Sequence, residues 1–320
     1  MDRRAALSAL AAAALAPSAL ARGRDRVRTI GYLSGGAGTE EIARLLAALG
    51  HVEGRNLRFF LRKPKEDDSD LDALAAELVG ERPDVLLAWG YERVAALHAA
   101  TRSIPIVCGL HPDPVRAGLA RSVARPGGNV TGLSSALTEI IHLRVAMLRA
   151  LRPRLQRVTL VHQPDYRGLA QFAAPLLEQL EREGVAARQR TGRTAADLEE
   201  ILSSLGDPER EAVDYFSFRG LSDPRVPGRL MLRHRVVAHS NDRQVVEHGA
   251  LFYCRLMWTE TRRMERTAEI LDKVLRGTPP AEIPIELPDR LDFLLNRRVA
   301  ATLGVKIPPE VLLRASEVIG

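Results

Sequence analysis

Short apolar segments alternate with helical periods along the first part of the chain. Between the apolar segments, apolar residues recur every three or four positions, which is typical of amphipathic helices. Buried strands separated by short helices indicate βαβ units and a parallel sheet. The pattern therefore predicts an α/β lobe of Rossmann-like type, with strands at 29–33, 57–61, 85–88 and 104–109 and helices at 40–49, 71–81 and 92–101.

The segment PGGNVTG, residues 126–132, interrupts this alternation with a proline and three glycines, which punctuate secondary structure. We expect a hinge here, at Gly127, Gly128, Thr131 and Gly132. Beyond it the alternation restarts, and a second α/β lobe is expected with a ligand cleft where the strand carboxyl ends of the two lobes face each other. The expected elements are helices at 139–151, 170–183, 195–205 and 261–275, and strands at 158–162, 185–189, 213–218 and 236–239.

Residues 1–21 have the features of a cleaved export signal. Arg3 and Arg4 precede a short run of alanine and leucine, and positions 19–21 form an A-x-A cleavage pattern. The run is short and Pro17 breaks it, so we expect no retained membrane-spanning helix. The alternative is a cytosolic tail. The signal predicts a periplasmic protein, exported by the Sec or the twin-arginine route.

The composition is that of a globular protein, with 46% hydrophobic and 27% charged residues. The 46 Lys and Arg residues exceed the 40 Asp and Glu residues by six, but they alternate with acidic residues along most helices, and only 4% of the chain is aromatic. A nucleic-acid binder concentrates basic residues in a patch interleaved with aromatics. We therefore expect no nucleic-acid partner. We also expect a monomer. Cys108 and Cys254 lie in apolar runs and are expected to be buried free thiols.

Motifs for catalysis are weak. The loop SGGAGT, residues 34–39, lacks the third glycine of G-x-G-x-x-G because Glu41 stands there, and Arg62 and Lys63 follow the next strand where an acid would bind a ribose. The chain has no nucleophile elbow, and its eight histidines show no metal-ligand spacing. We expect no catalytic residue, no cofactor and no metal. A nucleotide-dependent α/β enzyme is the distant alternative.

Polar and aromatic residues gather at the carboxyl ends of the expected strands, where α/β sheets bind ligands. A role in a turn or cap is an equal alternative for single residues, such as Asp113 before a proline or Ser240 before a helix. Trp89, beside a glycine, is either a core aromatic or a stacking face of the cleft. The candidate ligand-binding residues are Ser34, Trp89, Tyr91, His111 and Asp113 in the first lobe and Arg219, Ser240 and Asn241 in the second.

Five sequence blocks carry a resemblance to a known family. They are LGHVEGRNL (49–57), LAAELVGERPDVLLAWG (74–90), ATRSIPIVCG (100–109), HPDPVRAGLARSVARPGGNVTGLS (111–134) and LGVKIPPEVLLRASEVI (303–319). In this order they resemble the ABC transporter substrate-binding proteins that include tryptophan- and tyrosine-binding periplasmic components. The resemblance implies a type I periplasmic binding fold, in which a small ligand is clamped between two lobes and the closed protein docks on a membrane permease. We expect the chain to be the solute-binding component of an ABC-type uptake system that captures a small polar or amino-acid-like ligand by hinge closure.

The expected N-terminal lobe spans residues 28–132 with about 250–285, and the expected C-terminal lobe spans 133–249 with about 286–320. For an amino-acid-like ligand, we expect Asp113 to bind an ammonium group and Arg219 a carboxylate. The loops at the ligand edge depart from the family pattern, notably at Trp89 and at Phe218 and Arg219, which leaves the ligand open. An exported sensor protein that signals to a receptor is the alternative function.

Overall fold

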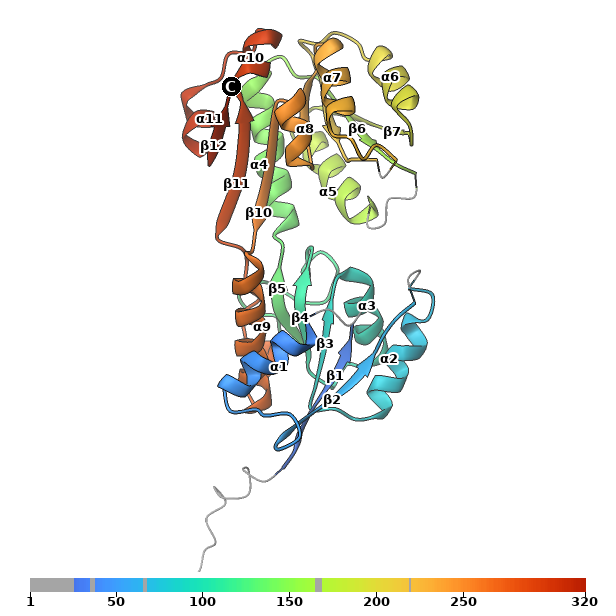
Figure 1. Ribbon diagram of the computed structural model, residues 1–320, viewed down its shortest axis with the longest axis vertical. Coiled ribbons are helices and arrows are strands. Elements are labelled where there is room, and N and C mark those ends of the chain that lie inside the picture. The colour runs from blue at the N-terminus through green and yellow to red at the C-terminus, as the bar shows by residue number, and fades with distance from the viewer. Residues whose placement is uncertain (1–25, 35–37, 66–67, 165–168, 219) are drawn as a thin grey trace, which may run out of the picture.

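The computed structural model describes residues 26–34, 38–65, 68–164, 169–218 and 220–320. Two α/β lobes lie end to end along the long axis of the molecule (Figure 1). Both sheets are formed mainly by parallel strands, and their carboxyl ends face the opposite lobe. This confirms the predicted fold class of two Rossmann-like lobes.

The first lobe has a five-stranded parallel sheet in the order β2-β1-β3-β4-β5. Its strands are β1 (Arg28–Leu33), β2 (Leu57–Arg62), β3 (Val85–Trp89), β4 (Ile106–His111) and β5 (Val130–Ser134). Its helices are α1 (Thr39–Ala48), α2 (Leu71–Gly80), α3 (Tyr91–Ala100) and α9 (Glu260–Leu275), followed by the 3-10 turn η1 (Pro280–Glu282).

Two apolar clusters cover the two faces of this sheet. On one face, Ile42 of α1 and Leu271 of α9 pack with Ile30. On the other face, Leu78 of α2 and Leu97 of α3 pack with residues of β1, β3 and β4. The central strands β3 and β4 are almost wholly apolar because both faces of the sheet are buried there, whereas the edge strand β2 carries the exposed Arg58.

The second lobe has a seven-stranded sheet in the order β12-β11-β10-β9-β8-β6-β7. Its strands are β6 (Arg157–His162), β7 (Ala186–Thr191), β8 (Glu211–Tyr215), β9 (Val237–Ser240), β10 (Phe252–Met257), β11 (Arg290–Asn296) and β12 (Glu317–Ile319). β10 and β11 pair antiparallel. Its helices are α4 (Leu137–Leu151), α5 (Leu169–Arg182), α6 (Ala195–Ser203), α7 (Arg225–Arg233), α8 (Arg243–His248), α10 (Arg297–Leu303) and α11 (Pro309–Arg314).

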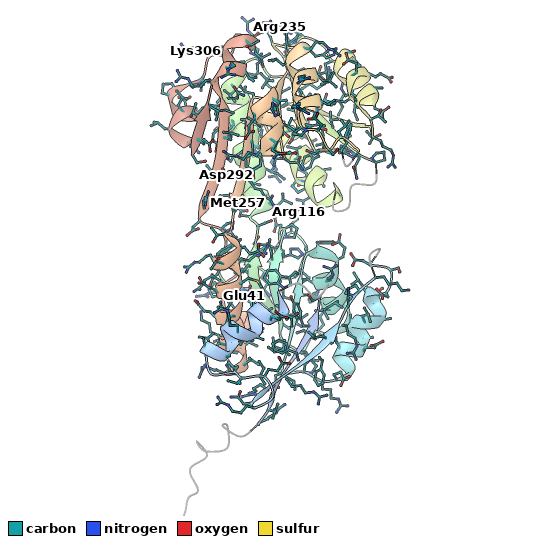
Figure 2. All side chains as sticks on the ribbon, in the orientation of Figure 1. Glu41, Arg116, Arg235, Met257, Asp292 and Lys306 are labelled. Carbon is teal, nitrogen blue, oxygen red and sulfur yellow. The ribbon has the colours of Figure 1, made fainter. Side chains whose placement is uncertain are left out.

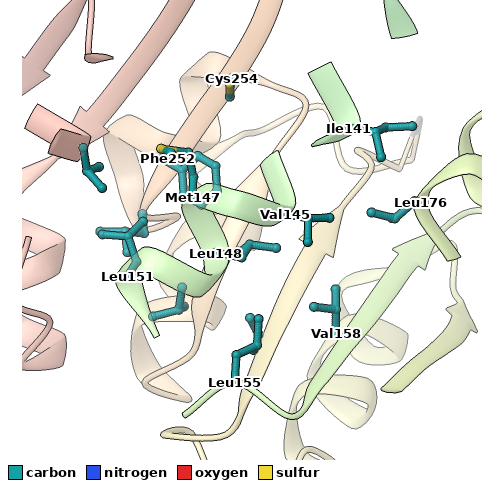
Figure 3. Packing of buried hydrophobic residues seen from close by; sticks show 14 of the residues in the cluster. Ile141, Val145, Met147, Leu148, Leu151, Leu155, Val158, Leu176, Phe252 and Cys254 are labelled. Carbon is teal, nitrogen blue, oxygen red and sulfur yellow. The ribbon is translucent and has the colours of Figure 1, made fainter. Parts of the chain in front are cut away.

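The core of the second lobe is centred on α4. Its buried face, with Val145 and Leu148, packs against Val158 of β6, Leu176 of α5 and Phe252 of β10 (Figure 3). The opposite face of the sheet is covered by α6, α7 and α8. α4 therefore begins at the boundary between the lobes and ends deep in the second one. Its first turn lies beside the segments that connect the lobes.

Three chain segments cross between the lobes, after β5, after β10 and before β11 (Figure 1). The crossings are hydrogen-bonded to each other: the Trp258 indole N–H donates to the Ser134 carbonyl at 2.8 Å, and the Ser134 amide donates to the Glu286 carbonyl at 2.8 Å. The expected segment 250–285 of the first lobe therefore starts too early, because β10 belongs to the second sheet.

The crossings also correct the expected hinge. Gly127 and Gly128 precede β5, at the end of the strand that is remote from the second lobe, and Thr131 and Gly132 lie inside β5. Gly132 has a φ of +132°, and a Cβ there would lie 2.0 Å from the Cys108 carbonyl oxygen. Its glycine is thus required by the close approach of β4, and not by bending between the lobes.

Candidate functional site

Four cavities adjoin one another between the lobes, beside the crossing segments. Neighbouring cavities share lining residues: Glu260 and Arg263 line the first and second, Ser135 and Arg255 the second and third, and Leu137 the third and fourth. In this order their volumes are about 300, 270, 110 and 280 Å³. Together we call them the inter-lobe groove. It lies where the strands of both sheets end, which is the ligand edge of α/β folds.

The first cavity, the Trp89 cavity, is lined by Ser34, Trp89, Arg93 and Arg263 among others. The Trp89 ring lies against Gly109, where a Cβ would come within 2.4 Å of it, and its N–H donates to the Tyr32 hydroxyl at 2.7 Å. The guanidinium carbon of Arg263 lies 4.9 Å from the ring centroid, a cation–π contact. Trp89 is therefore a fixed wall of the cavity.

The fourth cavity, the His111 cavity, contains Tyr91, His111 and Asp113 and extends to Ala174 on α5 of the second lobe. His111 is buried, its ring lies 5.3 Å from that of Tyr91, and its Nδ1 accepts a hydrogen bond from the Asp113 amide at 3.1 Å. Burial lowers the pKa of His111 to about 4. At neutral pH the ring is thus neutral, with its proton on Nε2, which has no hydrogen-bond partner among the described residues.

The Asp113 carboxylate is occupied by local contacts. Its Oδ1 accepts from the Arg116 amide at 2.9 Å, the turn role left open by the sequence, and its Oδ2 accepts from the Thr138 hydroxyl in the first turn of α4. Asp113 therefore ties the loop after β4 to the second lobe. Its expected contact with an ammonium group stays a prediction, since it would compete with these bonds.

At the strand ends of the second lobe, some polar groups are buried in turns and others line the groove. The Ser240 hydroxyl is fully buried and accepts from the Asp242 amide at 3.1 Å, so it shapes the turn before α8. Asn241 lines the third cavity, which we call the Arg144 cavity, together with Ser135, Arg144, Phe216 and Arg255. Arg219, the expected carboxylate ligand, lies outside the described residues.

An ionic network underlies the Arg144 cavity. An Arg144 Nη1–H donates to Asp214 Oδ2 at 3.0 Å, and Asp214 Oδ1 lies 2.7 Å from His239 Nδ1. Arg144 is 5% exposed, and the other two residues are fully buried. Burial raises the pKa of Asp214, but the Arg144 charge and His239 more than offset this and lower it; burial, reinforced by Arg144, lowers the pKa of His239. The network is thus Arg⁺, Asp⁻ and neutral His at neutral pH.

One donor of this network is unsatisfied. The Arg144 Nε–H is buried and has no hydrogen-bond partner in the described part of the chain. Leaving a buried donor unpaired costs about 1–3 kcal/mol. Such groups occur at sites where a ligand or water completes the set of hydrogen bonds.

Several groove residues were not anticipated from the sequence: Arg144, Phe216, Arg255, Glu260 and Arg263. Arg255 belongs to β10, and its neighbours Phe252, Tyr253 and Cys254 form an aromatic and apolar run that is typical of a strand. Recognising that strand would have placed Arg255 beside the crossing. Nothing local distinguishes Arg144 from the many other helical arginines.

These observations define the class of protein: a type I periplasmic binding fold, with two α/β lobes, three crossings and a groove between them. The chain belongs to the ABC transporter substrate-binding protein family, whose model matches residues 37–217 and 228–319. The family resemblance seen in the sequence is thereby confirmed. The family is one of substrate-binding proteins.

Individual relatives are distant. A tyrosine-binding protein of Clostridioides difficile (strain R20291) is 21% identical over 259 residues, which are 80% of this chain and 73% of that protein. The crystal structure of a conserved domain protein from Vibrio cholerae is 23% identical, with a TM-score of 0.62 and coverage of 92% and 100% of the two chains. An ABC domain from Streptococcus pneumoniae in complex with L-Trp is 19% identical, with a TM-score of 0.61 and coverage of 91% and 99%. At these identities the two solved structures show the shared fold.

The described residues contain neither a membrane-spanning helix nor a metal-binding cluster. None of their helices has the length and apolar character needed to cross a bilayer. No group of three or more His, Cys, Asp and Glu side chains within 26–34, 38–65, 68–164, 169–218 and 220–320 is arranged to hold a metal ion.

Proposed function

We propose that the protein is the exported solute-binding component of an ABC-type uptake system, and that it captures a small amino-acid-like ligand in the inter-lobe groove. The observation that carries the proposal is the groove itself. It is lined by strand ends of both lobes, among them Arg255 and Met257 of β10, and by the crossing residues Ser135 and Trp258. A ligand held there contacts both lobes and the segments between them.

Closure follows from this geometry. A ligand shifts a two-state equilibrium only by its differential affinity for the two states. A ligand in the groove binds more tightly when the lobes approach, because Asn241 of the second lobe and Trp89 of the first then contact it together. We place the hinge at the three crossings, where few backbone torsions separate the two packed sheets (Figure 1).

An amino-acid-like ligand is supported by both the relatives and the groove. Two relatives are named for tyrosine and L-Trp. In this chain the groove combines an aromatic wall at Trp89, apolar residues such as Phe216 and Leu137, and the cationic side chains Arg255 and Arg263. Such a lining suits a molecule with one apolar part and one acidic end.

The remaining parts of the proposal concern the export of the protein, its docking on the permease and its expected ligand contacts. Residues 1–21 would direct export to the periplasm, and the closed protein would deliver its ligand to a membrane permease. Docking as a monomer suits the fold, because both lobes then present a free surface to the permease. The contacts expected of Asp113 and Arg219 belong to the same proposal.

Binding and closure are tested on the chain from residue 22 onward. We expect at least one of the twenty standard amino acids to raise the melting temperature and to reduce the radius of gyration in small-angle X-ray scattering. Ser135→Tyr should abolish both effects because Ser135 lines two cavities of the groove. The matched control is Ser203→Tyr, on the exposed surface of α6. Binding without compaction, or binding unaffected by Ser135→Tyr, would contradict the proposal.

A further inference from the structure

The Arg144 cavity presents hydrogen-bond donors and no acidic group. Its volume of about 110 Å³ is several times the space that one water needs. The lining includes two arginines, one asparagine and one serine, with Phe216, Leu137 and Ile140 as apolar walls. No Asp or Glu of the described chain lines it. A cation therefore finds no charged partner in this cavity.

Asn241 is oriented by the second lobe so that its amide nitrogen remains available. Its Oδ1 accepts from the Ser217 amide at 3.0 Å and from the Ser217 hydroxyl at 3.2 Å. Because a backbone N–H can only donate, this atom must be the oxygen. The NH₂ group of Asn241 is thus left as a donor at the cavity.

Arg144 is held in place by Asp214 but is not saturated by it. Asp214 gives one oxygen to Arg144 and the other to His239, so the guanidinium and the carboxylate do not form the two parallel bonds of a fork. The Nε–H edge of the guanidinium stays unpaired and buried. Because this edge is buried, a ligand reaches it only if the Arg144 side chain shifts towards the cavity; a carboxylate oxygen is the group that then completes it.

The charges around the cavity give it a positive balance. The Arg144 charge is compensated by Asp214 within the core. Arg255 adds a second positive charge at the point where the Arg144 cavity joins the rest of the groove, and its side chain is exposed on β10. An anion entering from the groove passes Arg255 and meets Asn241 and Arg144.

We infer that the Arg144 cavity is an acid-group subsite in the second lobe, and that it takes the carboxylate of the captured ligand through Asn241, Arg255 and Arg144, in addition to the contact proposed for Arg219. This rests on the proposed function and deepens it. The ligand class is a small carboxylic acid whose remaining atoms extend along the groove towards Trp89. A neutral amide or amine analogue of the same shape is rejected.

The subsite is tested with two variants that each make the cavity less positive by one charge. Asn241→Asp keeps an oxygen that accepts from Ser217 but places a negative charge where the carboxylate binds. Arg255→Gln removes a charge from an exposed side chain. Gln189→Glu and Arg229→Gln are the matched controls; they make the same charge changes at exposed positions of the second lobe outside the four cavities.

Two probes are used on each variant. The first is the strongest binder among the twenty standard amino acids, compared by calorimetry with its α-carboxamide. The second is acetate compared with acetamide, followed by NMR at the arginine Nε–H groups, with the Arg144 resonance assigned by its loss in Arg144→Lys. We expect about tenfold or greater loss of affinity in Asn241→Asp and in the carboxamide, and little loss in the two controls. Acetate, but not acetamide, should shift the Arg144 resonance.

The outcomes separate the subsite from the proposed function. An amino acid that binds Asn241→Asp as tightly as Gln189→Glu overturns the subsite and leaves the proposed function standing. If no amino acid binds, the acetate experiment decides: a shift specific to acetate supports the subsite while the amino-acid ligand is abandoned. Equal effects of acetate and acetamide overturn the subsite.

Discussion

The two lobes share a topology but handle polar groups differently. In the first lobe the groove is lined by an aromatic wall, Trp89, fixed by Tyr32 and covered by Arg263. In the second lobe a buried network of Arg144, Asp214 and His239 lies directly beneath the groove. The comparison teaches that one lobe offers a stacking surface and the other an electrostatic anchor. A ligand must carry both kinds of group to hold the two lobes together.

The largest effect is expected from breaking the buried network of the second lobe. Asp214→Ala leaves the Arg144 charge buried without its partner, and breaking a buried ion pair in this way costs about 3–5 kcal/mol. Urea unfolding at pH 7 measures the loss. The control is Asp223→Ala, which removes the partner of Arg225 in an exposed pair and should change stability little. If Asp214→Ala lowers the free energy of unfolding no more than this control does, the second lobe has no buried ionic anchor and the difference between the lobes is contradicted.

A comparably local test applies to the first lobe. Gly132→Ala should destabilise by about 3 kcal/mol, because its Cβ would collide with the Cys108 carbonyl and because the positive φ disfavours a side chain. Gly184 in the second lobe also has a positive φ, of +68°, but a Cβ there meets nothing within 4 Å. Gly184→Ala should therefore cost only about 1 kcal/mol. Equal losses in urea unfolding would contradict the close approach of β4 and β5.

The pH dependence compares one buried histidine in each lobe. The pKa of His111 falls to about 4 and that of His239 is also lowered, both chiefly by burial. The unfolded chain, with histidine pKa values near 6.5, binds more protons than the folded chain, so stability decreases as the pH falls from about 6.5 towards 4. Each group should contribute roughly 1–3 kcal/mol to the loss between pH 7 and pH 4.5. Urea unfolding at pH 7 and pH 4.5 should show that His111→Gln and His239→Gln lose less stability than the unmodified protein over this pH range. An unchanged loss of stability would contradict the effect of burial on the two pKa values.

The smallest effect concerns a contact between the lobes. Arg116 lies on the first lobe facing the second (Figure 2), and its guanidinium forms two hydrogen bonds to Glu178 of α5, at 2.6 and 2.9 Å. Both side chains are more than a third exposed, so the pair is weak and screened by salt. Arg116→Gln should reduce ligand affinity about two- to fivefold at low salt and less at 0.5 M NaCl. A change that is independent of salt would show that the pair does not act through its charge.

Periodicity was sufficient to predict strands β1 to β4 and β6 to β9 and helices α1 to α6 and α9, but it predicted no helix at α7. It missed β5, because the glycines around Gly132 were read as a hinge although the close approach to Cys108 requires them. It also missed β10 and β11, where antiparallel pairing departs from the βαβ rule. A local sequence pattern contains no information on such long-range strand pairings. The positions of the crossings between the lobes depend on these pairings.

The sequence predicted those residues of the candidate site that directly follow the carboxyl end of a strand. Ser34, Trp89, Tyr91, His111, Asp113 and Asn241 all line cavities of the groove. Arg144 and Arg263 could not be found in this way, since each lies on a helix and reaches the groove only through the packing of that helix. Their roles depend on tertiary neighbours, Asp214 for Arg144 and Trp89 for Arg263.

Hydrogen exchange of the chain from residue 22 onward, with and without its strongest-binding L-amino acid, tests the central claim most directly. A ligand clamped between the lobes should slow amide exchange in both of them. The expected segments are 89–93 and 110–117 in the first lobe and 216–218, 241–244 and 255–257 in the second, together with the crossing at 258–260. Protection confined to one lobe, or located away from the groove, would contradict capture between the lobes.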